Sequence, residues 1–184
     1  MEPIATMQGG GFHDQPAGTW SDDTSMALCL MASITEHGRI VLRDIMRRFA
    51  DWRNHGQYTP HGVCFDCGGT CDAAISRYMR GTPAVDCGGT GERDNGNGSL
   101  MRILPLVFFL RNEYGEDWYK LSRPMFEIQF VSGLTHAHPI SVIACGIYLQ
   151  IAEHLLQGKI IEDVHYNLFP AVFTARFFYG RKHT

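Results

Sequence analysis

Two adjacent carboxylates, Asp22 and Asp23, follow Ser21 at the start of an amphipathic stretch. Successive residues of a helix point about 100° apart, so the two carboxylates would face different directions and could each serve a separate cation. Oxygen ligands of this kind suit Mg²⁺, Mn²⁺ or Ca²⁺ better than zinc. The alternative is plain helix capping, because Ser-Asp-Asp makes a good helix N-terminus without any metal.

A second segment that could do chemistry reads Asn-Gly-Asn-Gly-Ser-Leu-Met-Arg over residues 95–102. Its small residues would let a ligand approach the backbone. If a helix begins near Ser99, the N–H groups of residues 98–101 would form an anion site suited to a diphosphate. A flexible turn is the alternative, since Asn-Gly pairs are common turn formers. The segment is neither a dinucleotide-binding fingerprint nor a P-loop, because no strand precedes it and no Gly-Lys-Ser/Thr follows it.

Two histidines, His136 and His138, stand two residues apart before an apolar stretch. They could bind a metal or a ligand, but such a pair more often makes structural hydrogen bonds. A His-x-His pair without further soft ligands is weak evidence for zinc.

Three cysteines, Cys64, Cys67 and Cys71, have the spacing Cys-x2-Cys-x3-Cys. A zinc or iron–sulfur site would need a fourth ligand, such as Cys87 or His61, and the spacing fits no common site well. The alternative is a group of thiols packed around a helix start. The chain has six cysteines in all but no export signal, so we expect free thiols in a reducing cytoplasm.

The segments that position these residues are predicted to be helices. Apolar residues recur at i, i+3, i+4 and i+7 over 27–34, 42–49, 103–110 and 140–147. Strand-like alternation is scarce, and its best candidate is 169–178. The predicted fold class is therefore all-α, with glycine-rich loops between the helices.

The helix ends can also be read from the sequence. Ser21 is a predicted N-cap, and Asp66 or Thr70 is predicted to cap a helix running to Met79. Ser99 could cap the next helix, although Pro105 then predicts a kink, or a start nearer Ile103. Two glycines are natural helix ends, Gly38 and Gly158.

Length and composition indicate one globular domain, or at most two very small ones, for 184 residues with 45% hydrophobic and 19% charged residues. Lys plus Arg is 16 and Asp plus Glu is 19, so no basic excess favours non-specific binding of nucleic acid. The longest apolar runs, 103–110 and 140–151, are short or interrupted, so no membrane span is predicted. Residues 1–11 do not form a secretory signal.

Several of these motifs occur in a telling order: Trp-Ser-Asp-Asp-Thr-Ser-Met at 20–26, Thr-Pro at 59–60, Cys-Phe-Asp at 64–66 with Gly-Gly-Thr at 68–70, Asn-Gly-Asn-Gly-Ser-Leu-Met-Arg at 95–102, and Leu-Thr-His at 134–136. Together they resemble the ADP-ribosylglycohydrolase family. The resemblance is strongest over residues 10–158, and the first and fourth motifs are specific as a pair.

The resemblance implies a multi-helix orthogonal bundle with a cleft that holds two Mg²⁺, or sometimes Mn²⁺. It implies hydrolysis of the glycosidic bond between ADP-ribose and an acceptor, on an ADP-ribosylated protein or an ADP-ribose-containing small molecule. Ser21, Asp22 and Asp23 match the family's metal ligands, and the two aspartates are the expected catalytic residues. The expected substrate-binding residues are Gly96, Asn97, Gly98, Ser99, Met101 and His136.

Two elements of the family pattern are not found in this sequence, an opening Gly-Asp-Ala-Leu-Gly helix and a closing Asp-x-Asp-Thr/Ser segment. We therefore expect residues 1–184 to form a single partial, truncated domain with an incomplete second metal site. The leading hypothesis is a metal-dependent glycosidic hydrolase. The alternatives are a fragment or pseudoenzyme that binds ADP-ribose or a partner without turnover, and a protein with a cysteine-ligated metal.

Overall fold

The computed structural model describes residues 6–160, and this part of the chain is helical with no β-strand. The prediction of an all-α fold is confirmed. Six α-helices are present: α1 (Asp22–His37), α2 (Leu42–His55), α3 (Gly69–Met79), α4 (Pro105–Tyr114), α5 (Ser122–Gly133) and α6 (Pro139–Leu156). Three short 3₁₀ helices lie between them: η1 (Ala84–Asp86), η2 (Glu92–Asp94) and η3 (Trp118–Lys120). The strand candidate 169–178 lies outside the described residues.

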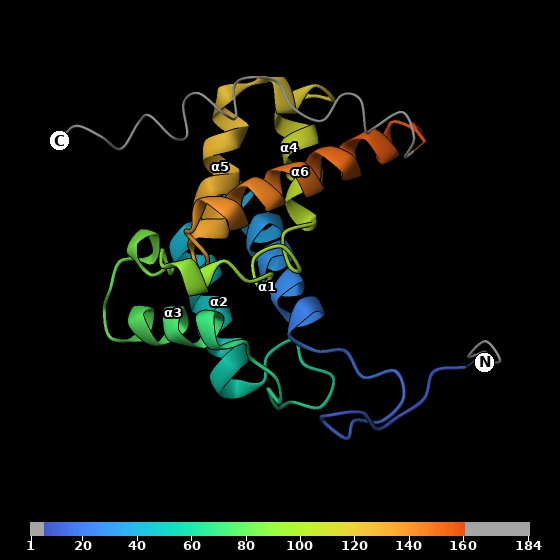
Figure 1. Ribbon diagram of the computed structural model, residues 1–184, viewed down its shortest axis with the longest axis vertical. Coiled ribbons are helices and arrows are strands. Elements are labelled where there is room, and N and C mark those ends of the chain that lie inside the picture. Colours follow the sequence, from blue (N-terminus) through green and yellow to red (C-terminus); the bar gives the residue numbers. More distant parts are fainter. Residues whose placement is uncertain (1–5, 161–184) are drawn as a thin grey trace.

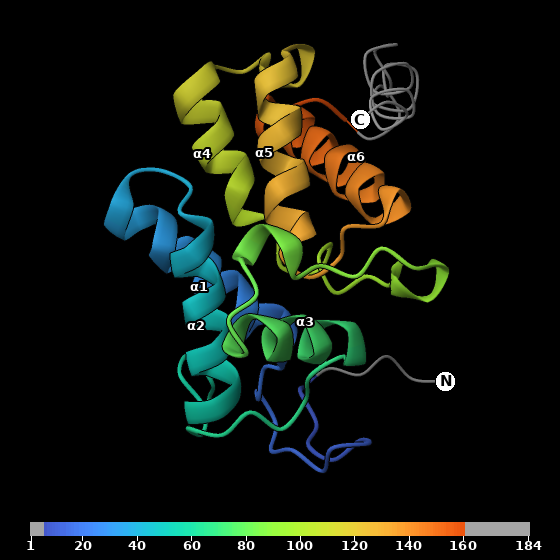
Figure 2. The ribbon, with the colours of Figure 1, turned by 90° about the vertical axis from the view of Figure 1, so that its left-hand side faces the viewer.

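The helices form two groups that lie one above the other (Figures 1 and 2). Helices α1 and α2 pack together and α3 lies against α2, whereas α4, α5 and α6 pack on one another. The groups meet where α1 contacts α4, and the long segment between α3 and α4 runs across the junction. This segment carries the glycine-rich loop, so the loop is held between the two groups.

Several predicted helix ends are confirmed, and others are wrong. Helix α1 begins at Asp22 after Ser21, and it ends at Gly38, whose φ of 61° is left-handed. Pro105 is the first residue of α4, so the later start is right and Ser99 caps no helix. Helix α3 follows Gly68, with no side-chain cap from Asp66 or Thr70.

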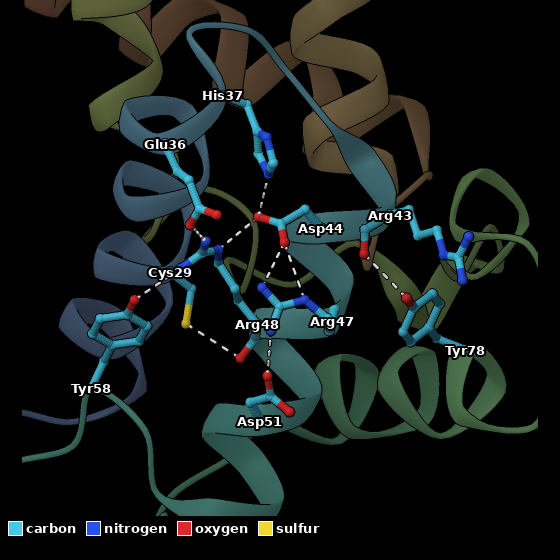
Figure 3. A network of polar contacts seen from close by, with 10 residues as sticks. All are labelled: Cys29, Glu36, His37, Arg43, Asp44, Arg47, Arg48, Asp51, Tyr58 and Tyr78. Atoms are coloured by element: carbon cyan, nitrogen blue, oxygen red, sulfur yellow. Dashed lines mark hydrogen bonds and ion pairs between the residues drawn. The ribbon is translucent and has the colours of Figure 1, made fainter.

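A polar network ties α1 to α2 and to the loop that follows α2 (Figure 3). The buried Arg48 donates to Asp44 Oδ2 over 2.7 Å and to the Tyr58 hydroxyl over 3.0 Å, and it also pairs with Glu36. Although burial of Asp44 opposes the effect, hydrogen bonds from Arg48 and Arg47 lower the pKa of this carboxyl. The network fixes Tyr58, whose carbonyl accepts hydrogen bonds from Trp20 and Ser25 at the start of α1.

Helix α6 is long and apolar enough to cross a membrane, by length and composition alone. The prediction that its interrupted sequence excludes a membrane span is therefore wrong on this criterion. The helix lies against α4 and α5, and it buries Glu153, which accepts hydrogen bonds from Arg111 and Trp118. A fully satisfied buried carboxylate of this kind needs protein partners rather than lipid.

Candidate functional site

A cavity of about 200 Å³ lies where the two groups of helices meet. Asp22 reaches it from the start of α1, and residues 68–71 reach it from the start of α3. The loop residues 96–98 and Met101 form another wall, and His136 closes it from the segment before α6. Four motifs that are far apart in the sequence therefore line one cavity.

The glycine-rich loop is a series of turns rather than the start of a helix, so the predicted helix N-terminus at residues 98–101 is wrong. Gly98 is required by close packing. A Cβ there would lie 2.6 Å from His136 Cε1 and 2.9 Å from Cys71 Sγ, both closer than side-chain atoms approach. Gly96 has more room, since its Cβ would lie 3.8 Å from His136 Nε2.

Ser99 is the predicted binding residue whose side chain does not line the cavity. It is fully buried, its Oγ lies 3.0 Å from Ser132 Oγ and 3.4 Å from Cys145 Sγ, and it therefore faces the core. Only its backbone belongs to the loop. Its hydroxyl anchors the loop to α5 and α6.

The two histidines have different roles. His138 caps α6, where its Nδ1 accepts a hydrogen bond from Ile140 N over 3.3 Å. His136 is 2% exposed and lines the cavity. Burial, with the charge of Arg102, lowers the pKa of His136 to about 4, so this ring is neutral at pH 7.

Asp22 is a buried carboxylate without a cationic partner among the described residues. It is 8% exposed, and one of its oxygens accepts a hydrogen bond from Asp23 N over 3.2 Å. Burial raises the pKa of Asp22, and the charges of Asp66 and Asp23 raise it further. The surrounding segments 6–38 and 54–76 contain no Lys or Arg. Negative charge gathered in this way favours a cation.

Asp23 does not face the cavity. Its carboxylate accepts a hydrogen bond from Ser21 Oγ over 2.9 Å, and it borders an apolar groove of about 510 Å³ between α1 and α4. Within residues 6–160, no three His, Cys, Asp or Glu side chains converge to hold a metal ion. Asp22 with water fits part of a Mg²⁺ site, because Mg²⁺ keeps several waters and uses one or two carboxylates. Asp22 and Asp23 do not by themselves form a complete set of metal ligands.

Asp66, a predicted helix cap that also belongs to the Cys-Phe-Asp motif, is a further candidate for which no site role was predicted. It does not line the cavity of about 200 Å³, but with Asp22 it borders a separate narrow crevice, and its Oδ2 lies 3.3 Å from His13 Nε2. The signal that could have revealed it is its place in the Cys-Phe-Asp motif. The position of this carboxylate next to Asp22 depends on how the loop after α2 folds back, which the local pattern does not show.

The thiols do not form a metal centre. All six cysteines are free, and Cys87 is buried where its Sγ contacts the carbonyl oxygens of Thr82 and Pro83. Burial, with Cys71 and Cys64 nearby, raises the pKa of Cys67 to about 12, so this thiol is protonated at pH 7. With no cluster of three ligands in the described range, the cysteine-metal hypothesis is wrong.

Comparison with known proteins now adds to this geometry. The model of the ADP-ribosylglycohydrolase family matches residues 2–175. The chain belongs to the ADP-ribosylglycohydrolase family. The resemblance seen in the motifs is thus confirmed over most of the sequence.

Curated relatives in this family act on ADP-ribosylated targets, by their names. The chain is 33% identical over 157 residues to the ADP-ribosylarginine hydrolase Tri1 of Serratia proteamaculans (strain 568), covering 85% of this chain and 40% of the relative. It is 30% identical to Tri1 of Pseudomonas putida (strain GB-1), covering 95% and 44%. It is 31% identical to the ADP-ribosyl-[dinitrogen reductase] glycohydrolase of Rhodospirillum rubrum, covering 83% and 47%.

A solved structure shares the fold. The chain superimposes on an ADP-ribosylglycohydrolase-related protein complex with a TM-score of 0.65 and 28% identity, covering 89% of this chain and 50% of that one. The chain therefore spans half the length of this structure and less than half the length of the curated relatives.

Proposed function

We propose that this chain takes part in hydrolysis of the glycosidic bond between ADP-ribose and an arginine side chain of a modified protein. The observation that carries the proposal is the cavity in which Asp22, the 96–101 loop and His136 meet. The names of two relatives support arginine as the acceptor. Water would add its oxygen to C1 of the ribose, the bond from C1 to the guanidine nitrogen would break, and the products would be free ADP-ribose and arginine.

Each wall of the cavity has a task in this reaction. The backbone of residues 96–98 lines the cavity, and it would hold the ribose and diphosphate. Asp22 places negative charge where positive charge develops at C1 as the bond to the acceptor breaks. The buried setting strengthens this interaction, because little water screens it.

Mg²⁺ is the cofactor that we propose. The family resemblance offers Ser21, Asp22 and Asp23 as candidate ligands, and of these three Asp22 lines the cavity. When bound, such a cation would orient ribose hydroxyls and favour ionisation of a water. The uncompensated charge around Asp22 supports this choice. A cytoplasmic location and the absence of nucleic-acid and membrane partners stay predictions.

The second candidate function is binding of ADP-ribose without turnover. One observation favours it: the described residues hold no cluster of three metal ligands. The two functions share the cavity and differ in whether the bond is cleaved.

A thermal-shift titration with ADP-ribose, with and without Mg²⁺, tests whether the site binds. Ligand at about 100 times its Kd adds about 2.7 kcal/mol, which for a chain of this size raises the Tm by about 5 to 10 °C. Asp22→Asn should remove the part of the shift that needs Mg²⁺, because the neutral amide is a weaker cation ligand.

Release of ADP-ribose from an arginine-modified protein then separates turnover from binding alone. Turnover that Asp22→Asn abolishes supports the hydrolase. Binding without turnover by the unmodified chain supports the second function. An Asp22→Asn chain that keeps full Mg²⁺-dependent activity would show the site assignment to be wrong.

A further inference from the structure

A buried guanidinium lies directly behind the cavity. Arg102, which ends the glycine-rich motif, has no exposed surface, and its Cζ lies 4.8 Å from the centre of the Phe49 ring. Its Nη2 donates to Val131 O over 3.2 Å and to Thr135 Oγ1 over 2.8 Å. Its Nε and Nη1 have no hydrogen-bond partner within residues 6–160. Burying a cation without a carboxylate partner costs free energy, so a functional role for Arg102 would explain why it is buried here.

Thr135 connects this guanidinium to His136. Its Oγ1 lies 2.8 Å from Arg102 Nη2 and 2.9 Å from His136 Nδ1. A guanidinium can only donate hydrogen bonds, so Thr135 Oγ1 accepts from Arg102 and keeps its own proton to donate elsewhere.

The Thr135 hydroxyl has two lone pairs and one proton, so two arrangements are open: it donates to His136 Nδ1, or Nδ1–H donates to it and its own proton goes to the Cys71 thiol that lies beside it. An unprotonated imidazole nitrogen is a strong acceptor, whereas a thiol sulfur is a weak one. Thr135 therefore donates to His136 Nδ1. In a neutral ring whose Nδ1 accepts, the proton is on Nε2.

The Nε2 edge of His136 lies on the cavity side of the ring. Nε2 is 3.1 Å from the point that a Cβ on Gly98 would occupy and 3.8 Å from the corresponding point on Gly96. Both glycines line the cavity with His136, and no group of residues 6–160 forms a hydrogen bond with Nε2. This N–H is thus left for a ligand.

We propose that Arg102 and Thr135 are positioning residues, which through the contacts Arg102 Nη2–Thr135 Oγ1–His136 Nδ1 fix His136 as an Nε2–H donor to a diphosphate oxygen of ADP-ribose. The identity of the ligand rests on the proposed function, whereas the tautomer of the ring does not. Neither positioning residue touches the ligand. Because the donor is uncharged and its direction is set beforehand, little order has to be imposed when the ligand binds.

The ligand-free protein provides the first test. Nitrogen-15 NMR of the His136 ring at pH 7, assigned with a His136→Gln variant, should show the proton on Nε2 and a bare Nδ1. Thr135→Val keeps the side-chain shape but removes the hydroxyl, so it should give a mixture of tautomers. Thr135→Ser keeps the hydroxyl and should retain the single tautomer.

Calorimetric titration with ADP-ribose provides the second test. Thr135→Val should weaken binding by the factor by which its Nε2–H population falls, which the NMR measures, because only this tautomer donates to the ligand. Thr135→Ser should bind within about twofold of the unmodified protein. Thermal melts of both variants show that each is folded, and the NMR of the unmodified protein needs no variant to fold.

Three results would overturn the proposal: a proton on Nδ1 in the unmodified protein, Thr135→Val binding as tightly as the unmodified protein, or Thr135→Ser failing to restore binding. The NMR could instead show the proton on Nε2 while calorimetry shows that the protein binds no ADP-ribose. That outcome upholds the positioning of His136 and overturns both the ligand and the proposed function.

Discussion

Replacing Gly98 by Ala should destabilise the protein through a clash that the structure locates. The added Cβ would lie 2.6 Å from His136 Cε1 and 2.9 Å from Cys71 Sγ. Ordinary contact starts near 3.4 Å, so His136 would have to withdraw by about 0.8 Å. His136 is held from behind by Thr135 at 2.9 Å, and Cys71 is 1% exposed, so neither neighbour can move freely.

The size of the effect follows from two opposing contributions. Overpacking a buried site costs about 1 to 3 kcal/mol. The loss of backbone freedom in the unfolded chain on going from Gly to Ala returns about 0.4 to 1 kcal/mol, because Gly98 does not need a positive φ. The net loss is about 1 to 2 kcal/mol, which lowers the Tm by about 2 to 8 °C in a chain of this length.

Gly96→Ala is the matched control, since it stands in the same loop and lines the same cavity. Its Cβ would make an ordinary contact of 3.8 Å with His136 Nε2. Its Tm should equal or slightly exceed that of the unmodified protein, as measured by calorimetry or circular dichroism. If the two variants melted within 1 °C of each other, the reason given for glycine at position 98 would be refuted.

Two further predictions concern charge. Between pH 6.5 and 4 the unmodified protein should lose about 3 kcal/mol more of its unfolding free energy than His136→Gln. In this range the unfolded ring, with a pKa of about 6.5, binds a proton, whereas the folded ring, with a pKa of about 4, stays neutral. Denaturant titrations across this range measure the difference, and parallel pH slopes would contradict it. Arg48→Met should cost about 2 to 3 kcal/mol, since it removes a buried guanidinium that joins Asp44, Glu36 and Tyr58, although Asp44 keeps its pair with Arg47; Arg47→Met, at a half-exposed side chain, should cost less than about 1 kcal/mol. Urea unfolding of both variants checks this, and equal losses would show that the Arg48 network does not hold the fold.

The helices that the sequence predicted are those with a clean apolar stripe, α1, α2, α4 and α6 among them. The helix α5 gave no such signal. Its inward residues Ile128 and Val131 are buried, but Phe126 and Phe130 are about half exposed on its other side. Counting from Met125, with Ile128 at i+3, the i+4 and i+7 positions are the polar Gln129 and Ser132, so the apolar repeat that predicted the other helices is interrupted here.

The candidate site was predictable in its residues and less so in its geometry. The motifs identified Asp22, His136 and the glycine loop, which do share a cavity. They could not show that Ser99 faces the core or that Asp23 borders the groove between α1 and α4. These side-chain directions depend on contacts between segments far apart in the sequence, so local spacing does not predict them.

The position of Asp22 depends in turn on a residue that contributes nothing chemical to the cavity. The Tyr58 carbonyl accepts hydrogen bonds from Trp20 Nε1 and Ser25 Oγ, both over 3.0 Å, and these two residues flank the start of α1. Tyr58 has a φ of 62°, which a non-glycine residue adopts only when its surroundings hold it there. Arg48 does so through the Tyr58 hydroxyl at 3.0 Å. The ion-pair network of α2 therefore sets where the buried carboxylate lies relative to Asp66, and weakening it should disturb the site before it unfolds the helices.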